Sequence, residues 1–174
     1  MLNRRKRHTV NSLVREFREI GYLKHFIIPA TIISTVIIFI SWIYFGGPCR
    51  VSMFFRIPYK GFTIASYYIL WFFMFFIAGG EYVIIIHRSR ECTKRIALLY
   101  HFAAHLCMIL WYPLFFNSFS QFLSLIMIIT ALILMVLYLK EVRNAMYILS
   151  LFAFFKIVVL IFFTYMNLVF LIIN

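Results

Sequence analysis

The sequence predicts an all-α integral membrane protein, built as one bundle of five transmembrane helices. Three observations lead to this fold class: the composition, the length of the apolar runs and the placement of the basic residues. Of the 174 residues, 65% are hydrophobic and 21% are aromatic. A soluble domain of this length has too small an interior to hide so much apolar surface. The composition therefore indicates a bilayer environment.

Five apolar runs are long enough to cross a bilayer, whose hydrocarbon core of about 30 Å needs about 20 helical residues. They lie at 26–45, 64–86, 96–116, 122–139 and 145–174. Backbone polar groups in lipid must be satisfied by a helix or a closed barrel, and these runs lack the alternation that is typical of barrel strands. We therefore expect five helices in one membrane domain, residues 26–174, after a basic tail at residues 1–25.

The basic residues gather on one side of the predicted spans. The chain has 17 Lys and Arg against 5 Asp and Glu, a formal net charge of +12, and most of the basic residues fall in the tail and in the loops after the second and fourth spans. Such residues mark the cytoplasmic side. We expect a cytoplasmic N-terminus and a C-terminus on the opposite side, in a bacterial cytoplasmic membrane or a mitochondrial or other organellar one. The tail charge favours anionic lipid as a partner over nucleic acid.

Two charged side chains fall well inside the apolar runs, Glu81 in the second and Lys156 in the fifth. Their depths differ by less than about 10 Å at a rise of 1.5 Å per residue, so an ion pair inside the bundle would explain both charges. Two interpretations stay open: a structural pair or a snorkelling lysine, or two charges that flank a polar ligand. Asn167 lies within about 20° of Lys156 around the helix, so both should face inward.

His101 and His105 are four residues apart in the third run and so share one helix face. This spacing is compatible with metal or haem ligands, with contacts to a bound ligand, and with hydrogen bonds between helices. We predict no metal site, because Glu81 is the only further candidate ligand at a similar depth. The sequence also lacks the nucleotide-binding and hydrolase fingerprints. No catalytic residue is predicted, and we do not expect an enzyme.

Three segments carry a family resemblance: LWFFMFFIAGG in the second run, ALLYHFAAHLCMILWYPLFF in the third and FFTYMNLVFLIIN at the end. In order and spacing they resemble the tryptophan-rich sensory or translocator proteins (TspO/MBR), a family of five-helix membrane proteins. The positions that match the family pattern are Pro58, Trp71, Gly79, Trp111, Pro113, Leu114, Phe115, Phe116, Asn167 and Asn174. The chain departs from that pattern at Lys156, where the family has an aromatic wall, and it has only three tryptophans.

The resemblance implies a divergent family member with a cavity among its helices that binds protoporphyrin IX, or another tetrapyrrole, lipid or sterol-like molecule, for transport or sensing. It also implies a homodimer. A porphyrin or haem would be a ligand, and no covalently held cofactor is expected. The residues expected to contact the ligand are Pro58, Trp71, Glu81, His101, His105, Trp111, Phe116, Lys156 and Asn167.

Three other functions stay open from the residues alone. The first is a small transporter or channel subunit that uses the charges of Glu81 and Lys156. The second is a haem- or metal-dependent membrane enzyme that uses His101 and His105. The third is a non-catalytic assembly factor whose partner is another membrane protein.

Overall fold

The structure is a computed structural model that describes residues 14–45, 64–88, 91–116, 120–143 and 146–173. These residues form helices, with no strand among them. In chain order the elements are the short helix Val14–Tyr22, α2 (Lys24–Phe45), α4 (Ile64–Arg88), α5 (Glu91–Phe116), α6 (Gln121–Val142) and α7 (Tyr147–Ile173). The all-α prediction is therefore confirmed for this part of the chain. The predicted site residue Pro58 and the family-matched Asn174 lie outside the described residues.

The helix lengths fit a multi-pass membrane protein. Four helices, α4 to α7, are each long and apolar enough to cross a bilayer. The helix Val14–Tyr22 and α2 meet at a bend of 81°, and they count as a fifth candidate span if the bent pair is taken as one. Many large apolar side chains on the outer faces are exposed, among them Ile33, Ile133 and Phe154. An exterior with so many exposed apolar side chains is suited to lipid rather than water.

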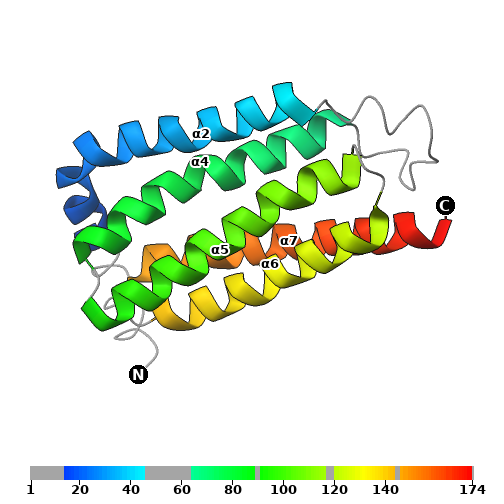
Figure 1. Cartoon of the computed structure of the whole chain (residues 1–174). Helices are drawn as coiled ribbons and strands as arrows, with labels where there is room; N and C mark the ends of the chain where they lie inside the picture. Colours follow the sequence, from blue (N-terminus) through cyan, green and yellow to red (C-terminus); the bar gives the residue numbers. More distant parts are fainter. Residues whose placement is uncertain (1–13, 46–63, 89–90, 117–119, 144–145, 174) are drawn as a thin grey trace.

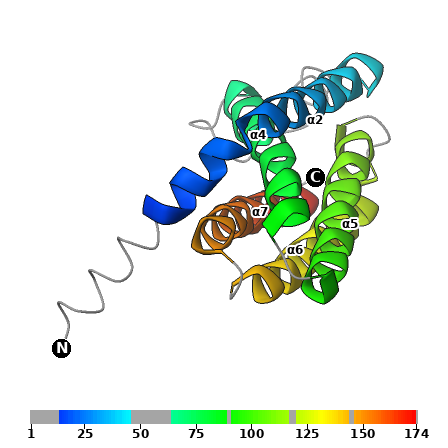
Figure 2. The ribbon, with the colours of Figure 1, turned by 90° about the vertical axis from the view of Figure 1, so that its left-hand side faces the viewer.

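The helices pack side by side along their lengths (Figure 1). α2 packs mainly on α4, α5 on α6, and α6 on α7, while α4 also contacts α5 and α7. Viewed from the end, α2 lies outside the group formed by the other four helices (Figure 2). The main core therefore lies among α4, α5, α6 and α7, and α2 covers one side of α4.

Three hydroxyl groups of α2 are satisfied within the helix itself. Thr31 donates to the carbonyl oxygen of Ile27 at 2.7 Å, and Ser34 donates to that of Ala30 at 2.9 Å. Thr35 donates to the carbonyl oxygen of Thr31 at 2.9 Å. Hydrogen bonds to the preceding turn allow these polar residues to lie at membrane depth without another partner.

One glycine explains why α2 lies so close to α4. A Cβ atom on Gly79 would lie 2.3 Å from the backbone oxygen of Ala30 and 2.7 Å from the hydroxyl of Ser34. Ala30 and Ser34 are four residues apart on α2, so small residues meet from both helices. Such small-residue contacts are a common way for membrane helices to approach closely. The backbone of α2 therefore rests on α4 at this level.

Candidate ligand pocket and buried polar cluster

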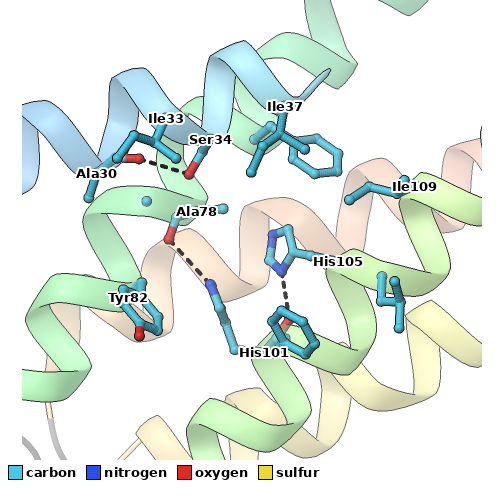
Figure 3. A pocket seen from close by; sticks show the side chains of 13 residues that line it. Ala30, Ile33, Ser34, Ile37, Ala78, Tyr82, His101, His105 and Ile109 are labelled. Atoms are coloured by element: carbon cyan, nitrogen blue, oxygen red, sulfur yellow. Dashed lines mark hydrogen bonds between the residues drawn. The ribbon is translucent and has the colours of Figure 1, made fainter. Parts of the chain in front are cut away.

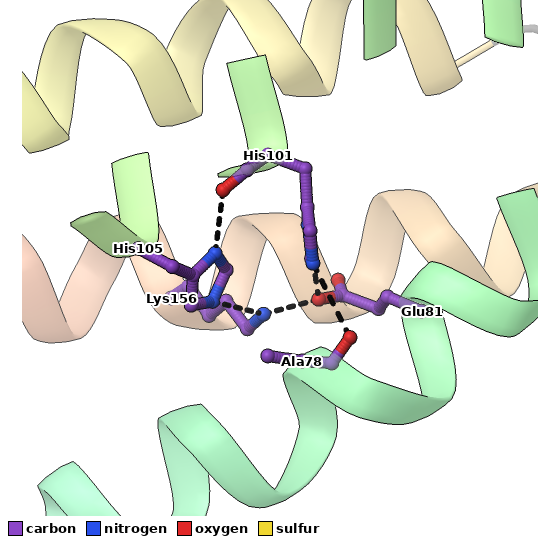
Figure 4. Close-up of polar contacts among 5 residues, drawn as sticks. All are labelled: Ala78, Glu81, His101, His105 and Lys156. Carbon is purple, nitrogen blue, oxygen red and sulfur yellow. Dashed lines mark hydrogen bonds and ion pairs between the residues drawn. The ribbon is translucent and has the colours of Figure 1, made fainter. Parts of the chain in front are cut away.

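Glu81 of α4 and Lys156 of α7 form an ion pair in the interior of the bundle (Figure 4). The ammonium group of Lys156 donates a hydrogen bond to Oε2 of Glu81. Both side chains are fully buried, with 0% of their surface exposed. The ion pair, one of the interpretations left open for these two charges, is therefore present. The snorkelling alternative is wrong for Lys156, because its ammonium points to Glu81 rather than to the membrane surface.

His105 of α5 extends the cluster. Its Nδ1 lies 2.6 Å from the backbone oxygen of His101, and its Nε2 lies 3.2 Å from Nζ of Lys156. A carbonyl oxygen can only accept, so Nδ1 carries the proton and Nε2 is left to accept from the ammonium group. The ring of Phe75 meets the imidazole edge-on, with 5.5 Å between ring centroids. These contacts fix the orientation of the His105 ring.

His101 connects α5 to α4. Its Nε2 lies 3.2 Å from the backbone oxygen of Ala78, so this nitrogen is the donor. Its Nδ1 then faces the carboxylate of Glu81, 3.8 Å from Oε2. The histidine pair therefore makes two helix-to-helix hydrogen bonds, one to α4 and one to Lys156 of α7, which was one of the three predicted uses. A third ring nitrogen, Nδ1 of His105, bonds within α5.

The described residues contain no group of three His, Cys, Asp or Glu side chains placed to hold a metal ion. Glu81, His101 and His105 are close to one another, but their mutual arrangement is one of hydrogen bonds and an ion pair.

A pocket of about 300 Å³ lies between α2, α4 and α5, next to this cluster (Figure 3). Its walls are almost entirely apolar and include several small residues. The main lining residues are Ala30, Ser34, Phe75, Ala78, Gly79, His101, Leu106 and Ile109, with His105 beside them. The imidazoles of His101 and His105 therefore belong both to the pocket wall and to the polar cluster. The α2 side of the pocket was not predicted, although the small residues Ala30 and Ser34 at a spacing of four were a usable signal.

Trp71 and Trp111 lie together in an aromatic core rather than along the pocket. Their ring centroids are 4.9 Å apart, and Phe163 of α7 meets Trp71 edge-on at 5.2 Å. All three side chains are buried. The assignment of the two tryptophans as ligand contacts stays a prediction. Phe116 is the last residue of α5, and its side chain lies outside the described part of the structure.

Asn167 faces inward, as predicted, and bonds to a side chain that the sequence analysis did not single out. Its Nδ2 donates to the hydroxyl of Ser124 at 3.0 Å, and the hydroxyl lies 3.3 Å from Oδ1 of the same amide. Ser124 and Tyr138 are both on the buried face of α6. Fourteen residues of helix place them within about 40° of each other. This spacing could have predicted that Ser124 and Tyr138 share one face of α6.

Comparison of the sequence with protein-family models, with curated proteins and with solved structures finds no match. The resemblance to TspO/MBR proteins therefore rests on the residues quoted above.

Proposed function

We propose that this chain is a multi-pass membrane protein that binds a hydrophobic ligand of the tetrapyrrole or lipid class in the pocket between α2, α4 and α5. The observation that carries the proposal is the double role of His101 and His105, which line an apolar pocket and also contact a buried ion pair. An apolar pocket with a few convergent polar groups is the usual form of a small-molecule site. Ionisable residues inside a membrane span are usually functional.

The pocket favours a ligand that is largely apolar with one polar edge. Phe75 and Ile109 supply apolar contacts, and the two imidazoles supply the polar side. Lys156 is not among the lining residues and lies behind His105, so its ammonium would act on a ligand through that imidazole. The volume of about 300 Å³ is at the lower end of the range of ligand pockets. We therefore expect one edge of a tetrapyrrole, or one chain of a lipid, to enter it.

The resemblance to TspO/MBR proteins supports the same class of ligand, since that family binds tetrapyrroles in a cavity among five helices. We propose that the chain is a divergent member of this type and forms a homodimer. Its N-terminus would lie in the cytoplasm, where the basic tail would meet anionic lipid.

A protoporphyrin IX titration of the detergent-purified protein, followed by the Soret shift, tests the proposal. Leu106→Trp should fill the pocket from its lipid-facing rim and weaken binding at least tenfold. Leu110→Trp is the matched control, because Leu110 is about as exposed, at 43% against 46%, on the same helix and does not line the pocket. Equal affinities in the two variants would place the porphyrin elsewhere.

Wild-type protein that melts cooperatively and shows no saturable porphyrin binding would remove the tetrapyrrole as ligand. The same titration with a fluorescent fatty acid and a fluorescent sterol then tests the lipid class. Weaker binding in Leu106→Trp, with no change in Leu110→Trp, would place the lipid in this pocket.

A second function is favoured by the hydrogen-bonded chain of Glu81, Lys156 and His105, which joins three helices in the interior. Such chains serve as proton relays in membrane transporters. If the protein moves ions or protons, reconstituted liposomes should show a flux that is lost in Glu81→Gln. Absence of flux with the wild-type protein would remove this function.

A further inference from the structure

Three polar atoms of the buried cluster have no hydrogen-bond partner within the described part of the chain. They are Oε1 of Glu81, Nδ1 of His101 and the phenolic oxygen of Tyr138, on α4, α5 and α6 respectively. All three side chains are at least nine-tenths buried. Buried polar groups in native proteins are nearly always paired with protein or with ordered water. Three unpaired atoms from three helices therefore need a common explanation.

His101 lies next to both of the other residues. Its Nδ1 is 3.8 Å from the Glu81 carboxylate, which is too long for a direct hydrogen bond. Its ring centroid is 5.2 Å from that of Tyr138. The unpaired atoms thus belong to one group of neighbouring side chains centred on His101.

The hydrogen-bonding character of each atom follows from its other contacts. Nε2 of His101 donates to the backbone oxygen of Ala78, so Nδ1 of the neutral ring is an acceptor. The Glu81 carboxylate is paired with Lys156 and is also an acceptor. Two acceptors cannot bond to each other, and they need a donor between them. The Tyr138 hydroxyl can donate one hydrogen bond of its own.

We propose that Glu81, His101 and Tyr138 bind one water molecule. The water donates one proton to Oε1 of Glu81 and the other to Nδ1 of His101, and it accepts from the Tyr138 hydroxyl. Three hydrogen bonds are the usual number for a buried water. A molecule that donates twice and accepts once fits this set, whereas a simple anion would leave the two acceptors, on Glu81 and His101, without a donor.

This water connects the pocket to the ion pair. His101 lines the pocket, and Glu81 is bonded to Lys156. A proton that reaches the Glu81 carboxyl can pass through the water to Nδ1 of His101: the carboxyl gives one proton to the water, the water gives one to the imidazole, and a carboxylate and an imidazolium remain. The site would therefore allow a proton to pass between Glu81, in the interior of the bundle, and His101, in the wall of the pocket.

Magnetic resonance of the full chain in bilayers, with ¹⁵N-labelled histidine, tests the proposal without any ligand. The signals of His101 are identified by their loss in His101→Gln. We expect a neutral ring with a protonated Nε2 and an unprotonated Nδ1, together with magnetisation transfer from a water molecule to this ring. In Tyr138→Phe the transfer should fall by at least half while the protonation pattern is kept. In the control Tyr165→Phe, on the outer face of α7, both should be unchanged.

Two results would overturn the site. A His101 ring protonated at both nitrogens would remove the acceptor that the water needs at Nδ1, and an unprotonated Nδ1 with no transfer from water would show that the site is dry. If Tyr138→Phe does not fold, the wild-type spectrum alone decides between these outcomes and the proposal.

Discussion

Lys156 on α7 and Glu81 on α4, 75 residues apart in the chain, bond to each other where neither is exposed. His105 accepts a second hydrogen bond from the same ammonium group. The pair tethers α7 to α4, two helices that otherwise share a small contact. Breaking a buried ion pair by removing one partner leaves an uncompensated charge and costs about 3–5 kcal/mol, while replacing both partners is often nearly neutral.

The first prediction follows from this asymmetry. Lys156→Met should lower the free energy of unfolding by about 3 kcal/mol or more, because the Glu81 carboxylate then lies buried without its partner. The double variant Glu81→Gln, Lys156→Met should recover most of that loss. Denaturation in mixed micelles measures both. Additive effects of the two single substitutions would mean that the pair contributes no coupling energy.

The second prediction concerns the contact of α2 with α4. Gly79→Ala places a methyl group against the backbone of Ala30, at a distance that real Cβ atoms do not reach. α2 must then move away from α4, and we expect a loss of roughly 1–3 kcal/mol, as for overpacked cores. The separation of the two helices can be followed by spin labels at exposed positions of each, and it should increase.

Gly80→Ala is the matched control for this substitution. A Cβ at Gly80 would lie 3.5 Å from a side-chain methyl of Ile27, which is an ordinary contact. Alanine is also favoured over glycine within a helix by about 1 kcal/mol. Stability should therefore be unchanged or slightly raised, and equal damage from both substitutions would contradict the close approach at Gly79.

The sequence was sufficient for properties that depend on one helix at a time. The span length predicted α4 to α7, and the angular spacing of Lys156 and Asn167 predicted that both face inward, as they do. The ion pair was one of the interpretations that the sequence left open, because a lone buried charge is so unfavourable in lipid that pairing would explain both charges.

The sequence could not predict properties that depend on how the helices pack against one another. Ser124 as the partner of Asn167, and Ala30 in the pocket wall, follow from the relative rotation and position of two helices. Periodicity gives the buried face of each helix but not which faces meet. For the same reason the three unpaired atoms around His101 could not be foreseen, since they come from three different helices.

The third prediction tests the amide contact between α6 and α7. Asn167→Ala and Ser124→Ala should each destabilise the protein, and the double variant should be no worse than the worse single one, since the two side chains bond to each other. Interhelical hydrogen bonds in a membrane protein average about 0.6 kcal/mol, with a maximum of about 1.7. A double-mutant cycle in denaturant measures the coupling, and a value of zero would mean that the contact does not hold the helices together.

The fourth prediction concerns Glu16, which lies on the short helix Val14–Tyr22. Its two carboxylate oxygens accept hydrogen bonds from the backbone N–H groups of Tyr147 and Ile148, each at 3.0 Å. These are the first residues of α7, whose N–H groups lack partners in the preceding turn. The carboxylate thus caps α7 from 131 residues away in the chain, and its charge suits the positive end of the helix dipole.

Glu16→Ala should therefore release the short helix from α7 and lower stability by about 0.5–2 kcal/mol, the usual effect of losing a helix cap. Trypsin cleavage after Arg15 and Arg18 should become faster, because the short helix loses its attachment to the bundle. Glu19→Ala is the control on the same helix, since Glu19 pairs with Arg15 in the preceding turn, at a separation of 3.9 Å. Equal cleavage rates in the wild type and Glu16→Ala would show that the short helix is held by its other contacts, and that the carboxylate serves α7 alone.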